Sequence, residues 1–316
     1  MKVITTTTTN AIQGKTLSEL SDNFISYLDI SEISVKSYKS GIKKFLMYLS
    51  ENGITSPDRT TIIEYKKMLS ERYTAKTVSC YLSSVKRFFS WLDAEGLYKD
   101  ISKGVKAPKL SHEHKRDAFS AQELGQIISG LDRSTLEEKR NYAIFTLISA
   151  CGLRTIEAVR ADVGDIRKIS GVQVLYVMGK GKSEKNEFVK LEQPVIDAIN
   201  DYLSLRGEVS EKEPLFASLA NRNKGGRMTT RSISRICKTV MKNAGYNSPR
   251  LTAHSLRHSA VTIALLGGLS LQEVCTFARH ANIATTTIYA HNINRIKSLA
   301  EFTIAQAIFG SQKRRM

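Results

Sequence analysis

Apolar side chains recur at helical spacing through the first hundred residues of the chain. Turn-forming residues at positions 52–58 and 71–76 separate the later apolar stripes. A polar stretch with five consecutive threonines precedes the first stripe. The pattern predicts a flexible leader over residues 1–15 and a bundle of about four helices over residues 16–100. The stripes begin at Phe24, Tyr38, Ile62 and Val78.

The apolar periodicity stops over residues 101–116. This segment combines Gly104 and Pro108 with lysines and histidines. A polar stretch of this kind is typical of a connection between domains. We therefore predict a basic linker here. Its cationic residues, Lys106 among them, could contact a phosphate backbone that the linker crosses.

Helical spacing resumes in residues 117–316, which we predict to form a second domain. Ser120 followed by Glu123 has the spacing of a capping box, so a helix is expected to begin there. A strongly apolar helix over residues 141–151 is expected to stop at Gly152. Apolar spacing near the C-terminus predicts a final tail helix.

A short interval of alternating apolar and polar residues interrupts these helices. Residues 172–178 and 188–191 have the period of β-strands, and turn formers and lysines lie between them. This predicts a β-hairpin, with residues 163–166 leading into a third strand. The chain is therefore predicted to be mainly α, with an N-terminal helical bundle and a mostly helical α+β domain that contains a small antiparallel sheet.

The charge of the chain favours a polyanionic partner. Its 316 residues include 47 Lys or Arg and 30 Asp or Glu, which gives a net charge of +17 and a pI near 9.7. Both predicted domains share this excess, so nucleic acid is the leading candidate. Anionic membrane is the alternative, but the most apolar stretches, 142–153 and 261–271, are shorter than the ~20 residues of a spanning helix.

Basic residues punctuate the polar faces of two predicted helices in the first domain. A solvated surface is the alternative interpretation of such charges. Their excess over acids, repeated on two helices, favours contact with a DNA backbone. The residues concerned are Lys36, Lys39, Lys43, Lys44, Lys76, Lys86 and Arg87.

The N-terminus and the cysteines indicate a cytoplasmic protein. No apolar signal-peptide segment follows the first methionine. Cys80, Cys151, Cys237 and Cys275 are far apart in the chain and form no C-x-x-C pair. We therefore expect reduced thiols, with neither disulfides nor a zinc site.

Five residues of the second domain form a set suited to phosphoryl transfer. Arg154 stands alone upstream. His254 lies three residues before Arg257, and His280 lies nine before Tyr289. Guanidinium groups are well shaped to bind the non-bridging oxygens of a phosphodiester, and histidines can add hydrogen bonds or move a proton near neutral pH. The tyrosine hydroxyl is then the nucleophile that attacks phosphorus.

A tyrosine nucleophile makes such a reaction reversible without ATP. The usual pKa of the hydroxyl is about 10, so deprotonation at pH 7 costs on the order of 4 kcal/mol, which nearby cations lower. Attack by Tyr289 conserves the bond as a phosphotyrosine ester, and the arginines remove the need for a metal cofactor. Lys180, in the hairpin turn, is the candidate general acid for the leaving hydroxyl. Lys182, in the same turn, is a candidate DNA contact.

Two other chemistries are disfavoured by the same residues. His254 and His258 have the spacing of a zinc pair, but Ser255 replaces the glutamate of the metalloprotease motif. Arginines also flank this pair. Residues 179–183, Gly-Lys-Gly-Lys-Ser, resemble a nucleotide-binding P-loop, yet Tyr176 stands where that loop requires glycine. We therefore expect no metal and no ATP.

With these residues in place, the chain resembles the tyrosine recombinase (phage integrase) family, and its two-domain Xer-type members most closely. The resemblance covers nearly the whole chain. Segments 151–157, 177–182, 254–259 and 280–289 carry it. The active site that it implies consists of Arg154, Lys180, His254, Arg257, His280 and Tyr289.

The resemblance also implies an architecture and an intermediate. The N-terminal bundle would be a SAM-like core-binding domain that clamps duplex DNA together with the catalytic domain. A 5′-hydroxyl would attack a 3′-phosphotyrosyl intermediate. The tail helix would dock into a neighbouring protomer, linking four subunits, with packing on its own domain as the alternative. One departure is Arg279, where the family usually has glycine; it is expected either to crowd the turn or to add a DNA phosphate contact.

The sequence thus favours a site-specific DNA recombinase that acts as a homotetramer through a Holliday junction, with or without accessory proteins. Its role would be integration or excision of a mobile element, DNA inversion or dimer resolution. A type IB topoisomerase-like enzyme and a non-catalytic DNA-binding regulator on the same fold are the alternatives. The linker, the helical clamp and the apolar tail favour the recombinase over the topoisomerase.

Overall fold

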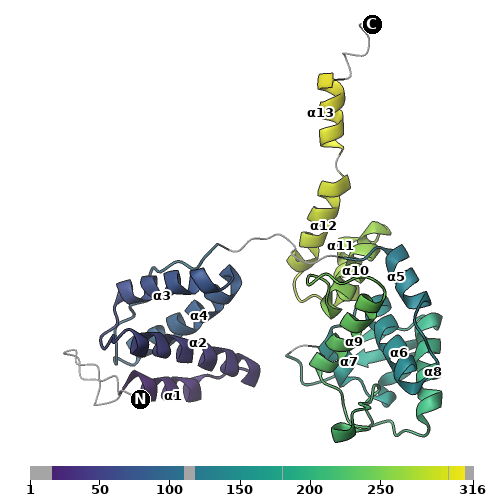
Figure 1. The fold of residues 1–316 in the computed structure, drawn as a ribbon, viewed down its shortest axis with the longest axis horizontal. Helices are drawn as coiled ribbons and strands as arrows, with labels where there is room; N and C mark the ends of the chain where they lie inside the picture. The colour runs from purple at the N-terminus through teal and green to yellow at the C-terminus, as the bar shows by residue number, and fades with distance from the viewer. Residues whose placement is uncertain (1–15, 110–117, 180, 298, 310–316) are drawn as a thin grey trace. The chain divides into compact units, whose positions relative to one another are not determined.

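The computed structural model describes residues 16–109, 118–179, 181–297 and 299–309 (Figure 1). They fall into two units that divide near residue 113, and each is considered by itself. The predicted leader, residues 1–15, and residues 110–116 of the predicted linker lie outside the described residues.

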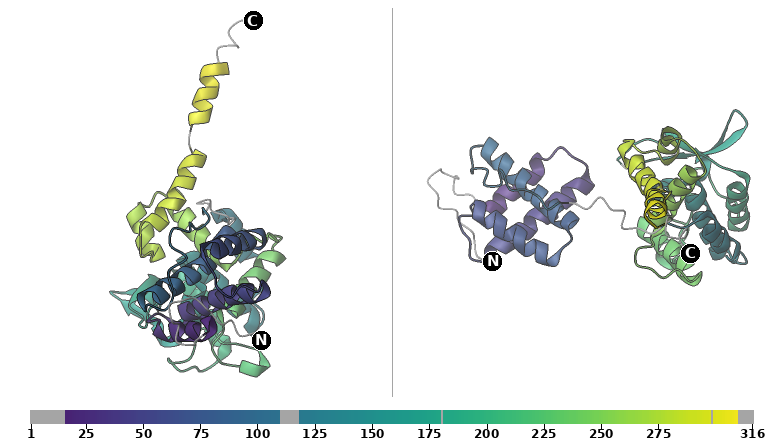
Figure 2. Two further views of the ribbon diagram at one scale, coloured as in Figure 1. Left: turned by 90° about the vertical axis from the view of Figure 1, so that its left-hand side faces the viewer. Right: turned by 90° about the horizontal axis from the view of Figure 1, so that it is seen from above.

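Four helices form the first unit, as the apolar stripes predict (Figure 1 and Figure 2). Each begins after a polar residue whose side chain accepts a hydrogen bond from a backbone N–H in the first turn. These capping residues are Thr16, Ser31, Asp58 and Thr74. The helices are α1 (Leu17–Tyr27), α2 (Glu32–Glu51), α3 (Arg59–Arg72) and α4 (Ala75–Ala94).

A buried aromatic core holds these four helices together. The ring of Phe45 meets those of Tyr65 and Phe89 edge to face, with centroids 5.0 and 5.8 Å apart. Each such pair adds about 0.5–1.5 kcal/mol beyond the burial of its apolar area. Val105 also lies in this core, so the first unit continues past the boundary that the sequence predicts at residue 100.

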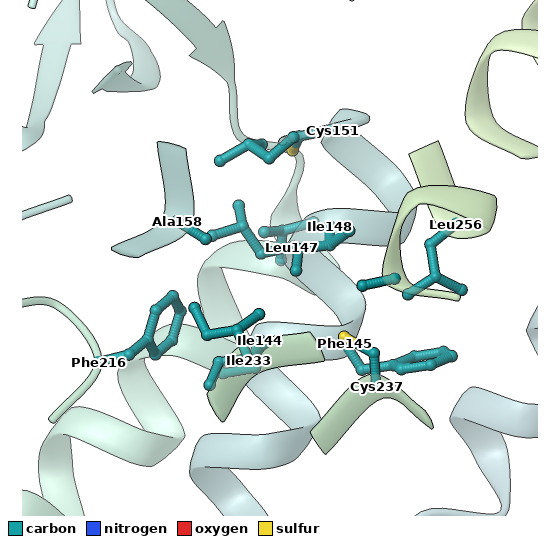
Figure 3. Close-up of a cluster of buried hydrophobic side chains, with 14 of the residues drawn as sticks. Ile144, Phe145, Leu147, Ile148, Cys151, Ala158, Phe216, Ile233, Cys237 and Leu256 are labelled. Carbon is teal, nitrogen blue, oxygen red and sulfur yellow. The ribbon is translucent and has the colours of Figure 1, made fainter. Parts of the chain in front are cut away.

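The second unit is built around α6, whose residues 143–149 are all buried; Figure 3 shows several of them in the core. Ile144, Phe145, Leu147 and Ile148 have no exposed surface, as expected of a helix at the centre of a domain. Helices α8, α9 and α10 pack against it. The helices are α5 (Ala121–Ser129), α6 (Leu136–Cys151), α7 (Thr155–Arg160), α8 (Gln193–Arg206), α9 (Thr230–Asn243), α10 (Ala253–Leu266), α11 (Leu271–Ala278), α12 (Ala284–Lys297) and α13 (Ala300–Phe309).

Three antiparallel strands, in the order β1-β2-β3, confirm the predicted small sheet. The strands are β1 (Ile166–Ile169), β2 (Val172–Val177) and β3 (Glu187–Lys190). Ser170 and Gly171 join the first two with positive φ angles of 49° and 83°, the conformation of a two-residue hairpin turn. The strand predicted to follow residues 163–166 is β1, and residues 163–165 form a short 3-10 helix that leads into it.

The last described helix, α13, is an exposed apolar tail. It has no buried residue, and Phe302, Ile304 and Phe309 are each more than half exposed. Packing of this helix on its own domain is therefore not observed among the described residues. Within the same described ranges, no helix is both long enough and apolar enough to cross a membrane.

Candidate active site

A tight junction between α6 and α7 places Arg154. The first helix ends at Gly152, whose φ of 57° is left-handed, and the second begins directly after Arg154. A Cβ on Gly152 would lie 3.1 Å from the ring of Phe277, so both conformation and space favour glycine. The Arg154 side chain is 27% exposed, which leaves part of its guanidinium accessible.

Glu157, one turn into α7, holds Arg154 from the inside. Its Oε1 lies 2.7 Å from Nη1 of Arg154, and its Oε2 accepts the Arg154 backbone N–H at 2.8 Å. Burial raises the pKa of this carboxyl, but Arg279 and Arg154 outweigh that effect, so its pKa lies below the usual value. Glu157 is therefore a buried carboxylate that holds Arg154 in place.

Arg257 is the most deeply buried cation of the cluster. It projects from α10 and is 1% exposed. Its Nη1 donates to the carbonyl of Gly152 at 2.5 Å, and its Nη2 donates to that of Ala278. Burial, together with Arg154 and Arg279, lowers the pKa of Arg257 to about 9, so it still carries a charge at neutral pH.

His280 lies beside the arginines and is neutral in the free protein. Burial and the charges of Arg257, Arg154 and Arg279 lower its pKa to about 4. Its Nδ1 is 2.9 Å from the hydroxyl of Thr286, a residue with no exposed surface. When the Nδ1–H donates to that hydroxyl, Nε2 is unprotonated and can accept a proton.

Tyr289 comes from α12 and lies against the same cluster. Its ring is 6.2 Å from that of His280, roughly parallel, and 4.6 Å from that of His258, edge to face. It packs against Val261 and Val274 and is only 5% exposed. The nucleophile predicted from the sequence is therefore next to the cations, with its ring enclosed.

The remaining predicted catalytic residues differ in their placement. His254 is exposed in the first turn of α10, one turn before Arg257. Lys180 lies outside the described residues. Its neighbour Gly179 is anchored, because Arg160 Nη1 donates to the Gly179 carbonyl at 3.0 Å. The structure thus brings four of the six predicted catalytic residues together: Arg154, Arg257, His280 and Tyr289.

Arg279, a predicted DNA contact, turns its guanidinium inward. The side chain is 5% exposed and lies 2.9 Å from Glu157 Oε2. This placement differs from the prediction because the turn at residue 279 aims the side chain at the buried carboxylate of Glu157, a partner that the sequence does not reveal.

The other predicted DNA contacts are at the surface. Lys36, Lys39 and Lys43 recur at spacings that place them on one face of α2. Arg87 of α4 lies 5.6 Å from the ring centroid of Tyr38 on α2, and Lys44 lies 5.8 Å from that of Tyr73. The others are exposed or half-buried: Lys76, Lys86, Lys106 and Lys182.

The prediction of DNA contacts from the sequence missed a basic segment around α9. Residues 214–272 contain nine Lys or Arg and no Asp or Glu. Helix α9 packs on α7, which begins directly after Arg154, so this charge lies beside the site. The absence of acids over so long a stretch was the signal available in the sequence. Its exposed members on α9 and the loop before it are Arg222, Lys224, Arg227, Arg231 and Arg235.

The cysteines are free thiols, and the described residues hold no cluster of candidate metal ligands. All four cysteines are unpaired, and burial raises the pKa of Cys151 and of Cys237 to about 12, which keeps both protonated. In the part of the chain that the structure describes, no three His, Cys, Asp or Glu side chains group as a metal site requires.

Two family models cover most of the chain. The catalytic model, described as the phage integrase family, matches residues 118–295. The model of the phage integrase N-terminal SAM-like domain matches residues 22–96. The predicted pairing of a SAM-like domain with a recombinase catalytic domain is confirmed.

Known proteins agree with these models. Tyrosine recombinase XerC of Caldanaerobacter subterraneus is 31% identical over 66% of this chain and 57% of its own length. XerD of Listeria innocua is 26% identical over 87% and 94%, respectively. A crystal structure of XerH recombinase bound to palindromic difH substrate has a TM-score of 0.71 at 21% identity, over 85% of this chain and 80% of that one, and so shares the fold. The chain belongs to the phage integrase family, whose members of similar sequence are Xer-type tyrosine recombinases.

Proposed function

We propose that the protein is a site-specific DNA recombinase that cleaves and rejoins duplex DNA through a phosphotyrosine ester. One observation carries the proposal. Arg154, Arg257, His280 and Tyr289, from four separate elements, meet in a single cation-rich site. A DNA phosphodiester is an anion that all four side chains can share.

In the cleavage step, the Tyr289 oxygen bonds to phosphorus while the bond to the 5′ oxygen breaks. The hydroxyl proton passes to His280, which is neutral in the free protein, and the leaving oxygen takes a proton from Lys180. The non-bridging oxygens gain charge as the fifth oxygen approaches, and Arg154 and Arg257 stabilise that charge. A 5′-hydroxyl of the partner duplex then attacks the 3′-phosphotyrosine and releases the tyrosine. The number of phosphoester bonds is unchanged, so no cofactor is consumed.

The free protein is closed around its nucleophile. Arg257 is 1% exposed and Tyr289 is 5% exposed, so a phosphodiester reaches both only if the segment that carries Tyr289 moves. Binding of DNA supplies the driving force, because the phosphate anion compensates the mutual repulsion of the guanidinium groups. Cleavage is thereby coupled to correct DNA binding.

Two basic surfaces would bind the DNA backbone. The first follows α2 and α4 and consists of Lys36, Lys39, Lys43, Lys44, Lys76, Lys86 and Arg87. The second is the acid-free region around α9, close to the catalytic cluster. Lys106 and Lys182 extend these contacts into the linker and the hairpin. Cations in such number give affinity that falls steeply with salt concentration.

Recombination requires several protomers on paired sites, and α13 offers the means to join them. Burial of its exposed apolar residues on another copy of the chain is more favourable than their exposure to water. This agrees with exchange of the tail helix around a homotetramer. The difH substrate in the XerH structure is palindromic, and a palindromic site suits a pair of protomers related by a two-fold axis. We propose the same arrangement here, with strand exchange through a Holliday junction in the cytoplasm and with accessory proteins as an optional addition.

Capture of DNA from the genome that encodes the protein tests this function. Cleavage of a nicked duplex releases the short fragment that carries the new 5′-hydroxyl, so the strand cannot be rejoined and a tyrosine recombinase stays covalently attached. We expect the wild-type protein to retain one family of sequences and the Tyr289→Phe variant to retain none covalently. Retention of unrelated sequences, with relaxation of supercoiled plasmid, would favour a topoisomerase-like enzyme. Sequence-specific binding without covalent capture would favour a regulator.

A further inference from the structure

Arg279 has an unusual backbone for an arginine. It follows α11 with φ 52° and ψ 48°, and among the described residues only Ser170 shares a positive φ without being glycine. Residues other than glycine and asparagine rarely adopt this left-handed backbone conformation, because their Cβ crowds the carbonyl oxygen. Interactions of the Arg279 side chain must therefore offset the free-energy cost of this backbone conformation.

Those interactions tie together three parts of the site. Nη1 of Arg279 donates to the carbonyl of Phe277 at 2.8 Å. Its Nη2 donates to Glu157 Oε2 at 2.9 Å and to the carbonyl of Gly152 at 3.3 Å. The guanidinium thus spans the end of α11, the start of α7 and the junction that places Arg154.

The carboxylate of Glu157 is shared between two arginines in a defined way. Oε1 accepts from Nη1 of Arg154, while Oε2 accepts both from Nη2 of Arg279 and from the backbone N–H of Arg154. With Oε2 occupied, Arg154 cannot close the two-bonded fork that guanidinium and carboxylate groups prefer. Its other terminal nitrogen, Nη2, instead donates to the backbone carbonyl of Arg279 at 3.0 Å. Each terminal nitrogen of Arg154 is held by one bond, which leaves its second N–H, and the Nε–H, for an incoming anion.

Charge supports the same conclusion. Glu157 removes one positive charge from a site that must stabilise an anion, and Arg279 restores it. The three guanidinium groups and one carboxylate carry a net charge of +2. This matches the two negative charges of the five-coordinate phosphorane, one from the phosphodiester and one from the deprotonated oxygen that adds to phosphorus. Without Arg279 the sum would be +1.

We propose that Arg279 is a positioning residue of strand transfer, which fixes Arg154 through Glu157 and through its own carbonyl. It does not contact DNA. This inference rests on the proposed recombinase function, and it assigns to Arg279 an effect on the chemical step rather than on DNA affinity.

The test compares Arg279→Gly with Arg279→Lys on a nicked duplex of the sequence that the wild-type protein captures. Glycine removes the side chain and adopts the positive φ without strain, while lysine keeps the positive charge and the strained backbone conformation. At saturating protein, we expect Arg279→Gly to cleave about 10- to 100-fold more slowly with a Kd within about twofold of wild type. Arg279→Lys should recover part of the lost rate.

A double variant shows whether the effect passes through Glu157. Adding Glu157→Gln to Arg279→Gly removes the unbalanced carboxylate, so the double variant should cleave faster than Arg279→Gly alone. Thermal unfolding confirms that the compared variants are folded.

Unchanged cleavage by Arg279→Gly would overturn the proposal. So would weaker binding with a normal saturated rate, which would make Arg279 a DNA contact, or equal loss in the glycine and lysine variants. Failure of the wild-type protein to capture DNA refutes the recombinase function itself and is seen before any variant is compared.

Discussion

Replacing Glu157 by glutamine tests the buried charge network at the centre of the site. The carboxylate has no exposed surface and lies 2.7 Å from Arg154 and 2.9 Å from Arg279. Removing one partner of a buried ion pair costs about 3–5 kcal/mol, because the remaining charges are left uncompensated. Glutamine keeps the shape and one oxygen acceptor, so we expect the free energy of unfolding to fall by about 3 kcal/mol. In a domain of this size that lowers Tm by about 6–12 °C.

The effect also has a pH signature. The folded-state pKa of Glu157 lies below its usual value of 4.5, so its carboxylate stabilises the fold above that pH. This stabilisation is lost as the pH falls through the folded-state pKa. The Tm difference between wild type and Glu157→Gln should therefore be largest near neutral pH and should narrow below about pH 4.5.

A matched control separates the ion pairs from helix capping. Glu273 also caps the first turn of its helix, through Ser270, but it is exposed. Glu273→Gln should cost less than about 1 kcal/mol. Scanning calorimetry at several pH values measures both variants. If Glu157→Gln melts within about 1 °C of wild type at pH 7, the buried carboxylate does not hold the site together and the reasoning fails.

Three further predictions concern the catalytic residues. Lys180→Ala should slow cleavage strongly with little change in Kd, and a 5′-thiol leaving group, which needs no proton, should restore the rate; loss of affinity instead would make Lys180 a backbone contact. The His280 ring should titrate near pH 4 in the free protein and at higher pH on duplex DNA, since a phosphate offsets the neighbouring cations; NMR of the ring protons measures both, and a free-protein pKa above 6 contradicts the buried, cation-rich environment. Gly152→Ala should lower the free energy of unfolding by about 1–3 kcal/mol, because the left-handed φ and the contact with Phe277 both oppose a Cβ; a denaturant titration checks this, and an unchanged midpoint would contradict it.

Local signals were sufficient for much of the fold. The capping box at Ser120 and Glu123 forms as predicted, the apolar helix ends at Gly152, and the alternation after residue 172 forms strands. Each depends on neighbours within a few positions, so short-range chemistry determines it.

The placement of the site residues depends on long-range packing and was harder to predict. The structure places Arg154, Arg257, His280 and Tyr289, which the motifs singled out, in one cluster, and their catalytic roles stay a prediction. Motif spacing did not reveal that Arg279 turns inward, because its partner Glu157 is 122 residues away in sequence. The burial of Tyr289 likewise results from contacts with α10 and α11. The basic region around α9 could have been found, since an acid-free run is visible without a structure.

The central claim is that Tyr289 forms the covalent bond to DNA. Its most direct test is mass spectrometry of the trapped complex after digestion with protease and nuclease. We expect one tryptic peptide, the one containing Tyr289, to carry a 3′-linked nucleotide, and we expect Tyr289→Phe to yield no adduct. A nucleotide on another residue, or covalent capture by Tyr289→Phe, would contradict this account.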